Sequence, residues 1–247
     1  MKGLLEICCG SFEDVKNAWE NGADRAELNS ALYLGGLTPS LAHLICAKEQ
    51  CDIPVVTMVR PRGGGFCYSK EEYRTMLLDA RILLDHGADG IAFGFLHADH
   101  TLDVARTEEM IALVHEKGKE AVFHRAFDCV AQQEHAVETL ISLGTDRILT
   151  SGGAPDAWTG RKQLQWLQSQ YGKEITFLAG SGVNAENVKD LMEYTKVEQV
   201  HTSCRKWNVD GTTSHQNVDF SYDAEKKDAY EMVDPQKVEK MVKVLTL

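Results

Sequence analysis

Short apolar segments alternate with longer amphipathic segments along the whole chain. The short segments are typical of buried strands, and the longer ones carry apolar residues at helical spacing. We predict strands at Leu4–Cys9, Arg25–Leu28, Val55–Val59, Gly90–Phe95, Glu120–His124, Arg147–Thr150, Ile175–Ala179 and Gln199–Thr202. We predict helices at Phe12–Glu20, Ser40–Gln50, Lys70–His86, Val104–Lys117, Ala131–Leu143, Trp158–Tyr171, Asn184–Tyr194 and Pro235–Leu245. This alternation indicates βα units and a parallel sheet.

One junction recurs where a helix gives way to a strand, as in Asn21-Gly22-Ala23-Asp24, His86-Gly87-Ala88-Asp89 and Leu143-Gly144-Thr145-Asp146. Glycine suits the left-handed position that ends a helix. Eight units in 247 residues predict a single (β/α)8 TIM-barrel domain over residues 1–247. The alternative is an open doubly wound sheet, which usually carries G-x-G-x-x-G after its first strand. This chain has Cys8-Cys9-Gly10-Ser11 there.

One segment, Lys206–Ala229, is polar and fits none of the units. We predict a long loop after the eighth strand that serves as a lid or a contact surface.

Composition narrows the partners and the location. The net charge of −11, with no cluster of Lys and Arg, argues against nucleic acid as a partner. No apolar stretch approaches the ~20 residues that span a membrane. The segment Met1–Cys9 is too short for a signal peptide and carries Glu6, so we expect a cytoplasmic protein. The seven cysteines are an odd count without a C-x-x-C pair, which predicts reduced thiols.

Polar residues on the first two strands point toward the barrel axis. Alternation turns Glu6 and Cys8 inward on the first strand, and Arg25, Glu27 and Asn29 inward on the second. Glu6, Arg25 and Glu27 are expected to form one buried network, because a buried charge needs a partner. This network is either a structural ion cluster or a source of a general acid or base.

Two motifs after later strands carry candidate anion-binding and proton-transfer groups. Arg60 and Arg62, in a proline- and glycine-rich loop, can grip a carboxylate or phosphate, or are simply surface charge. After the fifth strand, His124 and Asp128 are candidates for proton transfer and Arg125 for anion binding. The alternative there is a helix-capping Asp and a packed His.

The last three strands end in small residues, and many barrels bind phosphate at this position. The candidates are Ser151, Gly180, Ser181, Gly182 and Ser203. The alternative is that tight turns simply need glycine. Cys204 or Ser203 can also lie near Cys8, and thiols suit Cu(I), although buried cysteines often act as small apolar residues. The strand ends carry no Lys, which makes a Schiff-base mechanism improbable.

Six segments, in this order, resemble the CutC family of copper homeostasis proteins: Leu5-Glu6-Ile7-Cys8, Gly22-Ala23-Asp24-Arg25-Ala26-Glu27-Leu28, Gly35-Gly36-Leu37-Thr38-Pro39-Ser40, Arg60-Pro61-Arg62-Gly63-Gly64, Phe123-His124-Arg125-Ala126-Phe127-Asp128 and Arg147-Ile148-Leu149-Thr150-Ser151-Gly152. The resemblance implies a TIM barrel, a cytoplasmic location, self-association as a dimer or tetramer, and Cu(I) as a cofactor with Cys8 as its ligand. Many relatives have a cysteine where this chain has Asn29, and commonly an Asp where it has Gly65. The first difference weakens copper binding, and the second removes one carboxylate.

Three functions remain open. The first is copper homeostasis with Cu(I) bound through Cys8. The second is a TIM-barrel isomerase, lyase or hydrolase acting on a small anionic or phosphorylated metabolite. An oxidoreductase fits less well, because no dinucleotide-binding motif is present. The third is a scaffold that acts through its surface, which leaves the buried polar residues unexplained.

Overall fold

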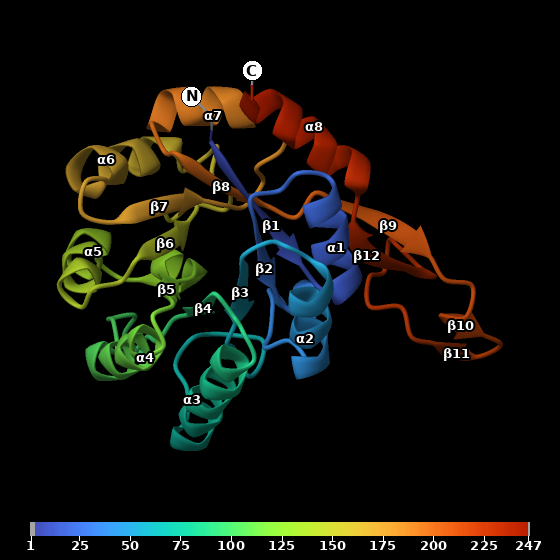
Figure 1. The fold of residues 1–247 in the computed structure, drawn as a ribbon, viewed down its shortest axis with the longest axis horizontal. Helices are drawn as coiled ribbons and strands as arrows, with labels where there is room; N and C mark the ends of the chain where they lie inside the picture. The colour runs from blue at the N-terminus through green and yellow to red at the C-terminus, as the bar shows by residue number, and fades with distance from the viewer. Residues whose placement is uncertain (1–2, 247) are drawn as a thin grey trace.

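Eight parallel strands close into a barrel in the computed structural model, which describes residues 3–246 (Figure 1). The strands are β1 (Leu4–Cys9), β2 (Arg25–Leu28), β3 (Val55–Met58), β4 (Gly90–Phe93), β5 (Glu120–Phe123), β6 (Arg147–Thr150), β7 (Thr176–Ala179) and β8 (Gln199–Thr202). They pair in chain order, and β8 closes on β1. The predicted TIM-barrel fold is confirmed.

Helices surround the barrel in Figure 1. They are α1 (Phe12–Glu20), α2 (Leu41–Gln50), α3 (Lys70–Asp85), α4 (Val104–Glu116), α5 (Gln133–Ser142), α6 (Arg161–Tyr171), α7 (Val188–Thr195) and α8 (Pro235–Thr246), with short 3-10 helices η1 (Leu32–Leu34) and η2 (Arg125–Cys129). Helix α7 begins later than predicted. The Asn184 side chain accepts hydrogen bonds from the N–H groups of Glu186 and Asn187, which forms a turn before the helix. No helix within residues 3–246 combines the length and hydropathy needed to cross a membrane.

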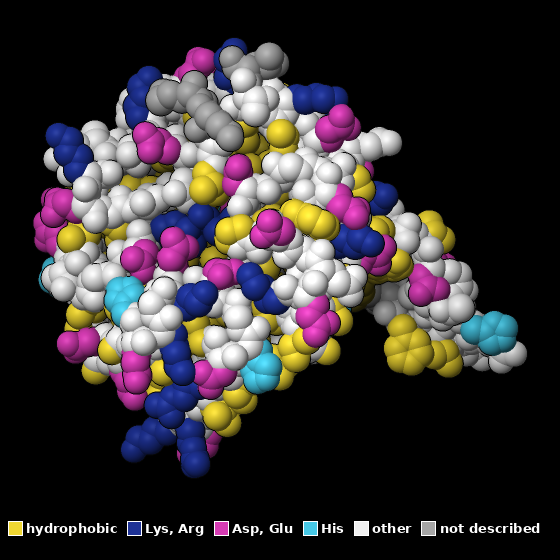
Figure 2. Space-filling view, viewed as in Figure 1, with side chains coloured by type: hydrophobic (Ala, Val, Ile, Leu, Met, Phe, Trp, Pro, Cys, Tyr) yellow, Lys and Arg dark blue, Asp and Glu magenta, His cyan; other side chains and the backbone are white. Residues whose placement is uncertain are grey.

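The polar segment after β8 differs from the irregular loop that we predicted. Strands β9 (Arg205–Val209) and β12 (Ala229–Val233) pair antiparallel, and β10 (Ser214–His215) pairs with β11 (Val218–Asp219). This ribbon projects from the barrel and exposes hydrophobic side chains (Figures 1 and 2). Its overall polarity hid short strands that are too brief and too exposed to give a clear alternation.

Hydrophobic packing occurs in two places. The main core lies between the strands and the helices, where outward residues such as Ile7, Leu28 and Phe123 are fully buried. A second, small cluster of Val56, Met58, Ala92 and Val122 comes from β3, β4 and β5. These residues alternate with the outward ones, so the cluster fills the barrel interior on that side.

The other side of the barrel interior is charged. Strand register places Glu6 beside Arg25 on β2 and beside His201 on β8. Glu6 accepts hydrogen bonds from Arg25 Nε and from His201 Nδ1, the latter at 2.7 Å. Arg25 also donates to Gln199 Oε1 at 2.8 Å. The predicted pairing of Glu6 with Arg25 is confirmed, whereas Glu27 joins this network through His201.

We expect Glu6→Gln to lower the free energy of unfolding by about 3–5 kcal/mol, because it leaves the buried Arg25 guanidinium without its counter-charge. Urea denaturation near neutral pH measures this change. Glu20→Ala is the matched control, because Glu20 forms an exposed pair with Lys16 that contributes at most about 1 kcal/mol. Equal effects of the two substitutions would contradict a stabilising role for the buried pair.

Candidate functional site

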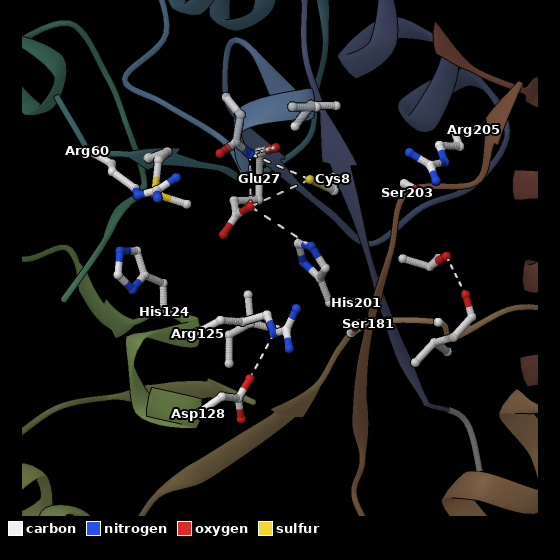
Figure 3. A pocket seen from close by; sticks show the side chains of 18 of the residues that line it. Cys8, Glu27, Arg60, His124, Arg125, Asp128, Ser181, His201, Ser203 and Arg205 are labelled. Carbon is white, nitrogen blue, oxygen red and sulfur yellow. Dashed lines mark hydrogen bonds and ion pairs between the residues drawn. The ribbon is translucent and has the colours of Figure 1, made fainter. Parts of the chain in front are cut away.

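A cavity of about 590 Å³ opens at the carboxyl ends of the strands. Its wall includes Cys8, Glu27, Asn29, Leu32, Gly35, Met58, Arg60, Phe66, His124, Arg125, Asp128, Cys129, Leu149, Ser181, Gly182, Val183, Asn184, His201, Thr202, Ser203, Arg205 and Glu231. Figure 3 shows Arg60 and His124 on one side and Ser203 and Arg205 on the other, with Cys8, Glu27 and His201 between them. This is where TIM barrels place their working residues.

Cys8, Glu27 and His201 form a compact group of metal-ligand types. One ligand atom from each lies within 4.8 Å of the other two. Cys8 Sγ is 3.8 Å from Glu27 Oε2, and His201 Nε2 is 3.9 Å from the same oxygen. Register explains the grouping, because Cys8 is the β1 neighbour of Glu27, and His201 is the β8 neighbour of Glu6.

The charges of this group depend on burial and on each other. Burial disfavours the Glu6 carboxylate, but Arg25 and His201 outweigh it and lower the pKa of Glu6 to about 2. Burial raises the pKa of the Cys8 thiol and of Glu27. Burial opposes a charged His201, but Glu27, Cys8 and Glu6 together raise its pKa well above the ordinary value.

The orientation of His201 follows from Glu6. An ionised carboxylate can only accept, so the hydrogen bond to Glu6 places a proton on His201 Nδ1 and turns Nε2 toward Cys8 and Glu27. Carboxylates orient metal-binding histidines in this way in many proteins.

Asn29 is the direct neighbour of this group. Its Nδ2 donates to Glu27 Oε2 at 2.8 Å and lies 3.7 Å from Cys8 Sγ. The amide therefore contacts two of the three ligand-type side chains. It holds Glu27 in place and gives the Cys8 sulfur a hydrogen-bond donor.

Arg125 enters the cavity as a positioned cation. Its Nε donates to Asp128 at 2.8 Å, and its Nη2 donates to Ser151 Oγ at 2.9 Å. Asp128 also accepts from Thr150 Oγ1, from Ser151 and from the N–H of Gly153. The bonds around Asp128 leave this carboxylate engaged in orienting Arg125, while Nη1 of Arg125 has no protein acceptor within residues 3–246.

The two arginines of the strand-3 loop have different surroundings. Arg60 lines the cavity, yet its Nη groups donate to the carbonyls of Leu34, Gly36 and Gly64. Arg62 does not belong to the cavity wall, because its guanidinium pairs with Glu72 on α3. The structure therefore brings Arg60 to the cavity and separates Arg62 from it.

His124 is buried in the cavity wall, and its Nδ1 accepts a hydrogen bond from the Ala126 N–H at 3.1 Å. Burial and the nearby charge of Arg60 lower the pKa of His124 to about 3. The imidazole is therefore neutral, and its proton resides on Nε2. This atom is buried and has no hydrogen-bond partner within the described chain.

The turns after β7 and β8 contribute unevenly to the cavity wall, and of the two only the turn after β7 contains glycine. Ser181, Gly182 and Ser203 line the cavity, and no hydrogen bond from the N–H groups of Ser181, Gly182 or Val183 to another part of residues 3–246 is present. The Gly180 N–H donates to the Thr150 carbonyl, and Ser151 is buried behind Arg125, so neither residue belongs to the wall.

Three wall residues that carry an imidazole, a guanidinium or a carboxylate were absent from the predicted site: His201, Arg205 and Glu231. His201 was identifiable, because alternation on β8 turns it inward beside Glu6. Arg205 and Glu231 pair across β9 and β12, so their position depends on the projecting ribbon. Cys204 is buried outside this wall and does not join Cys8.

Comparison with known proteins identifies the family to which this chain is similar. Residues 3–206 match the sequence model of the CutC family. A CutC family protein of Treponema denticola is 44% identical over 214 residues, which is 86% of each chain. A CutC family protein of Glaesserella parasuis is 39% identical over 98% of this chain and 99% of its own length. A solved CutC structure from Streptococcus agalactiae, described with a proposed role in copper homeostasis, superposes with a TM-score of 0.77 at 29% identity, covering 81% of this chain and 98% of that one.

The neutral state of His124 predicts a pH effect on stability. The unfolded imidazole titrates near 6.5 and the folded one at about 3, so the unfolded state binds an extra proton between these values. Stability is therefore lost as pH falls from about 6.5 toward 3. We expect His124→Gln to lose less stability than the parent protein between about pH 7 and pH 4.5, as measured by urea denaturation. Equal losses would contradict a buried neutral His124.

Proposed function

The chain belongs to the CutC family, and from this premise we propose that the mouth of its barrel binds a copper ion as part of copper homeostasis. The observation that carries the proposal is the grouping of Cys8, Glu27 and His201 in the cavity. We assign Cys8 and His201 as the ligands of Cu(I).

Two of the three side chains, Cys8 and His201, are of types that bind Cu(I). Thiolate and imidazole are ligands that copper accepts, whereas a carboxylate suits harder ions. Glu6 supports the fit, because it fixes the His201 ring with Nε2 toward Cys8. Binding displaces protons from the Cys8 thiol and from His201 Nε2. Glu27, next to both ligands, supplies a negative charge that favours a cation.

We expect Cys8→Ser to weaken Cu(I) binding at least about tenfold, because the change removes the only soft ligand of the group. Titration of the reduced protein against a competing Cu(I) chelator measures this change. Cys67→Ser is the matched control, because Cys67 is exposed and outside the cavity wall. Binding that survives Cys8→Ser, or a site that takes Zn²⁺ in preference to Cu(I), would contradict the proposal.

The position of Asn29 allows a complementary gain of affinity in the same titration. Its Nδ2 lies 3.7 Å from Cys8 Sγ, so Asn29→Cys places a second sulfur beside the first. Two thiolates suit Cu(I) better than one, and the variant should bind Cu(I) at least about tenfold more tightly than the parent. An unchanged affinity would mean that copper does not bind at this position.

A second candidate function has its own observation. Arg125 Nη1 and the N–H groups of Ser181, Gly182 and Val183 are donors without protein acceptors in or beside the cavity wall. A glycine-containing turn with free N–H groups is suited to phosphate. We propose that the cavity also takes a small anionic or phosphorylated metabolite. Glu27 is the candidate for proton transfer, because Glu6 and Asp128 are engaged in holding His201 and Arg125.

We expect Arg125→Met to weaken phosphate binding about tenfold or more, because it removes a charge-assisted donor. The readout is isothermal titration with inorganic phosphate. Arg62→Met is the matched control, since Arg62 carries the same charge but pairs with Glu72 outside the wall. If both variants bind phosphate like the parent protein, or the parent does not bind it at all, the anion site is excluded.

A further inference from the structure

His124 presents a hydrogen-bond donor that the rest of the chain does not use. Its side chain is 3% exposed, and its Nε2 has no partner within residues 3–246. A buried N–H left without an acceptor costs about 1–3 kcal/mol. Because this unpaired N–H lies in the wall of a cavity, a hydrogen bond to a bound molecule would explain why it is retained.

The ring of His124 is held in one orientation. Its Nδ1 accepts the Ala126 N–H, so His124 caps η2. The Nδ1–Cε1 edge lies against Gly94, where an added Cβ would stand only 2.6 Å from both atoms. A side chain at position 94 would displace the ring. The glycine and the cap together keep the imidazole fixed and its proton on Nε2.

Phe66 packs over this ring and connects it to the glycine loop. The Phe66 and His124 ring centroids are 5.0 Å apart, and the Arg60 guanidinium lies 5.2 Å from the centroid of Phe66. Phe66 follows three consecutive glycines, and Gly65 has no neighbouring atom within 4 Å of a Cβ built on it. The Leu96 N–H holds the Phe66 carbonyl at 3.0 Å, so a displacement of Phe66 from His124 requires rotation of its side chain and no shift of its backbone.

We propose that His124 Nε2–H donates a hydrogen bond to a carbonyl or carboxylate oxygen of the small molecule in the cavity, with Phe66 displaced when that molecule binds. This inference rests on the second proposed function, the binding of a small anionic metabolite. Because the ring is fixed and uncharged, His124 donates its Nε2 proton in a hydrogen bond without taking up a second proton from the ligand. The charge of Arg60 beside it favours an oxygen that carries negative charge.

The two ends of the cavity define the ligand class. His124 and Arg60 lie on one side, and Ser181, Ser203 and Arg205 lie on the other (Figure 3). A molecule that satisfies both ends carries a phosphate at one end and a carbonyl or carboxylate oxygen at the other. The geometry thus favours small phosphorylated oxo compounds or phosphorylated carboxylic acids over inorganic phosphate.

Two variants separate the donor from the cap. His124→Asn keeps an oxygen near the position of Nδ1 for the Ala126 N–H but has no donor at the position of Nε2. His124→Gln carries an amide that reaches the position of Nε2. We expect 2-phosphoglycolate or dihydroxyacetone phosphate to bind at least about tenfold more weakly to His124→Asn, with recovery in His124→Gln, in isothermal titration. Inorganic phosphate should bind all three proteins equally.

A second measurement uses the parent protein and probes without phosphate. Glycolate carries a carboxylate and hydroxyacetone a carbonyl, and either should shift the NMR signal of the His124 Nε2–H. Phosphate compounds that bind equally to all variants would overturn the inference but leave the anion function intact. A shift by glycolate or hydroxyacetone without any phosphate binding would support the inference while excluding the phosphate site. No shift and no binding would overturn both.

Discussion

The buried Glu6 carboxylate is the interaction on which the site depends. Its charge is held inside the barrel by Arg25 on β2 and His201 on β8, so it joins three consecutive strands across the point where the barrel closes. A buried carboxylate without such partners would cost several kcal/mol. The same contacts set the tautomer of His201 and direct its Nε2 toward Cys8. Stability of the barrel and orientation of the candidate ligands therefore have one cause.

The barrel interior is divided between two kinds of packing. Strands β3, β4 and β5 fill it with Val56, Met58, Ala92 and Val122, whereas β1, β2 and β8 contribute charged groups and side chains of metal-ligand type. This division separates the Cys8 thiol and the His201 imidazole, on β1 and β8, from the neutral His124, which directly follows β5. The cavity therefore presents both charged side chains and the uncharged N–H donor of His124 to a bound molecule.

Much of the fold followed from the sequence, because period-2 alternation and glycine junctions are local signals. Alternation also turned Glu6, Cys8, Arg25 and Glu27 inward as observed. The site was harder to predict from the sequence, because a position at a strand end does not determine the direction in which a long side chain extends. Arg62 points away from the cavity because its guanidinium pairs with Glu72, which lies ten residues further along the chain on α3. His201 needed a joint interpretation of β8 and β1, and the ribbon residues needed strands too short to detect.

The copper and anion proposals use different residues of the same cavity, and this proximity has a physical consequence. Cys8, Glu27 and His201 lie between the donors at the two ends of the cavity (Figure 3). An occupied metal position would add positive charge beside an anion and strengthen its binding, and the anion would in turn strengthen metal binding, because such coupling is reciprocal. Asn29 contacts both Cys8 and Glu27, so it affects the binding of the copper ion as well as that of the anion. If copper binds as proposed, the Asn29 amide would leave Cys8 as the one soft ligand of this group, and the remaining cavity could hold the proposed anion beside the ion.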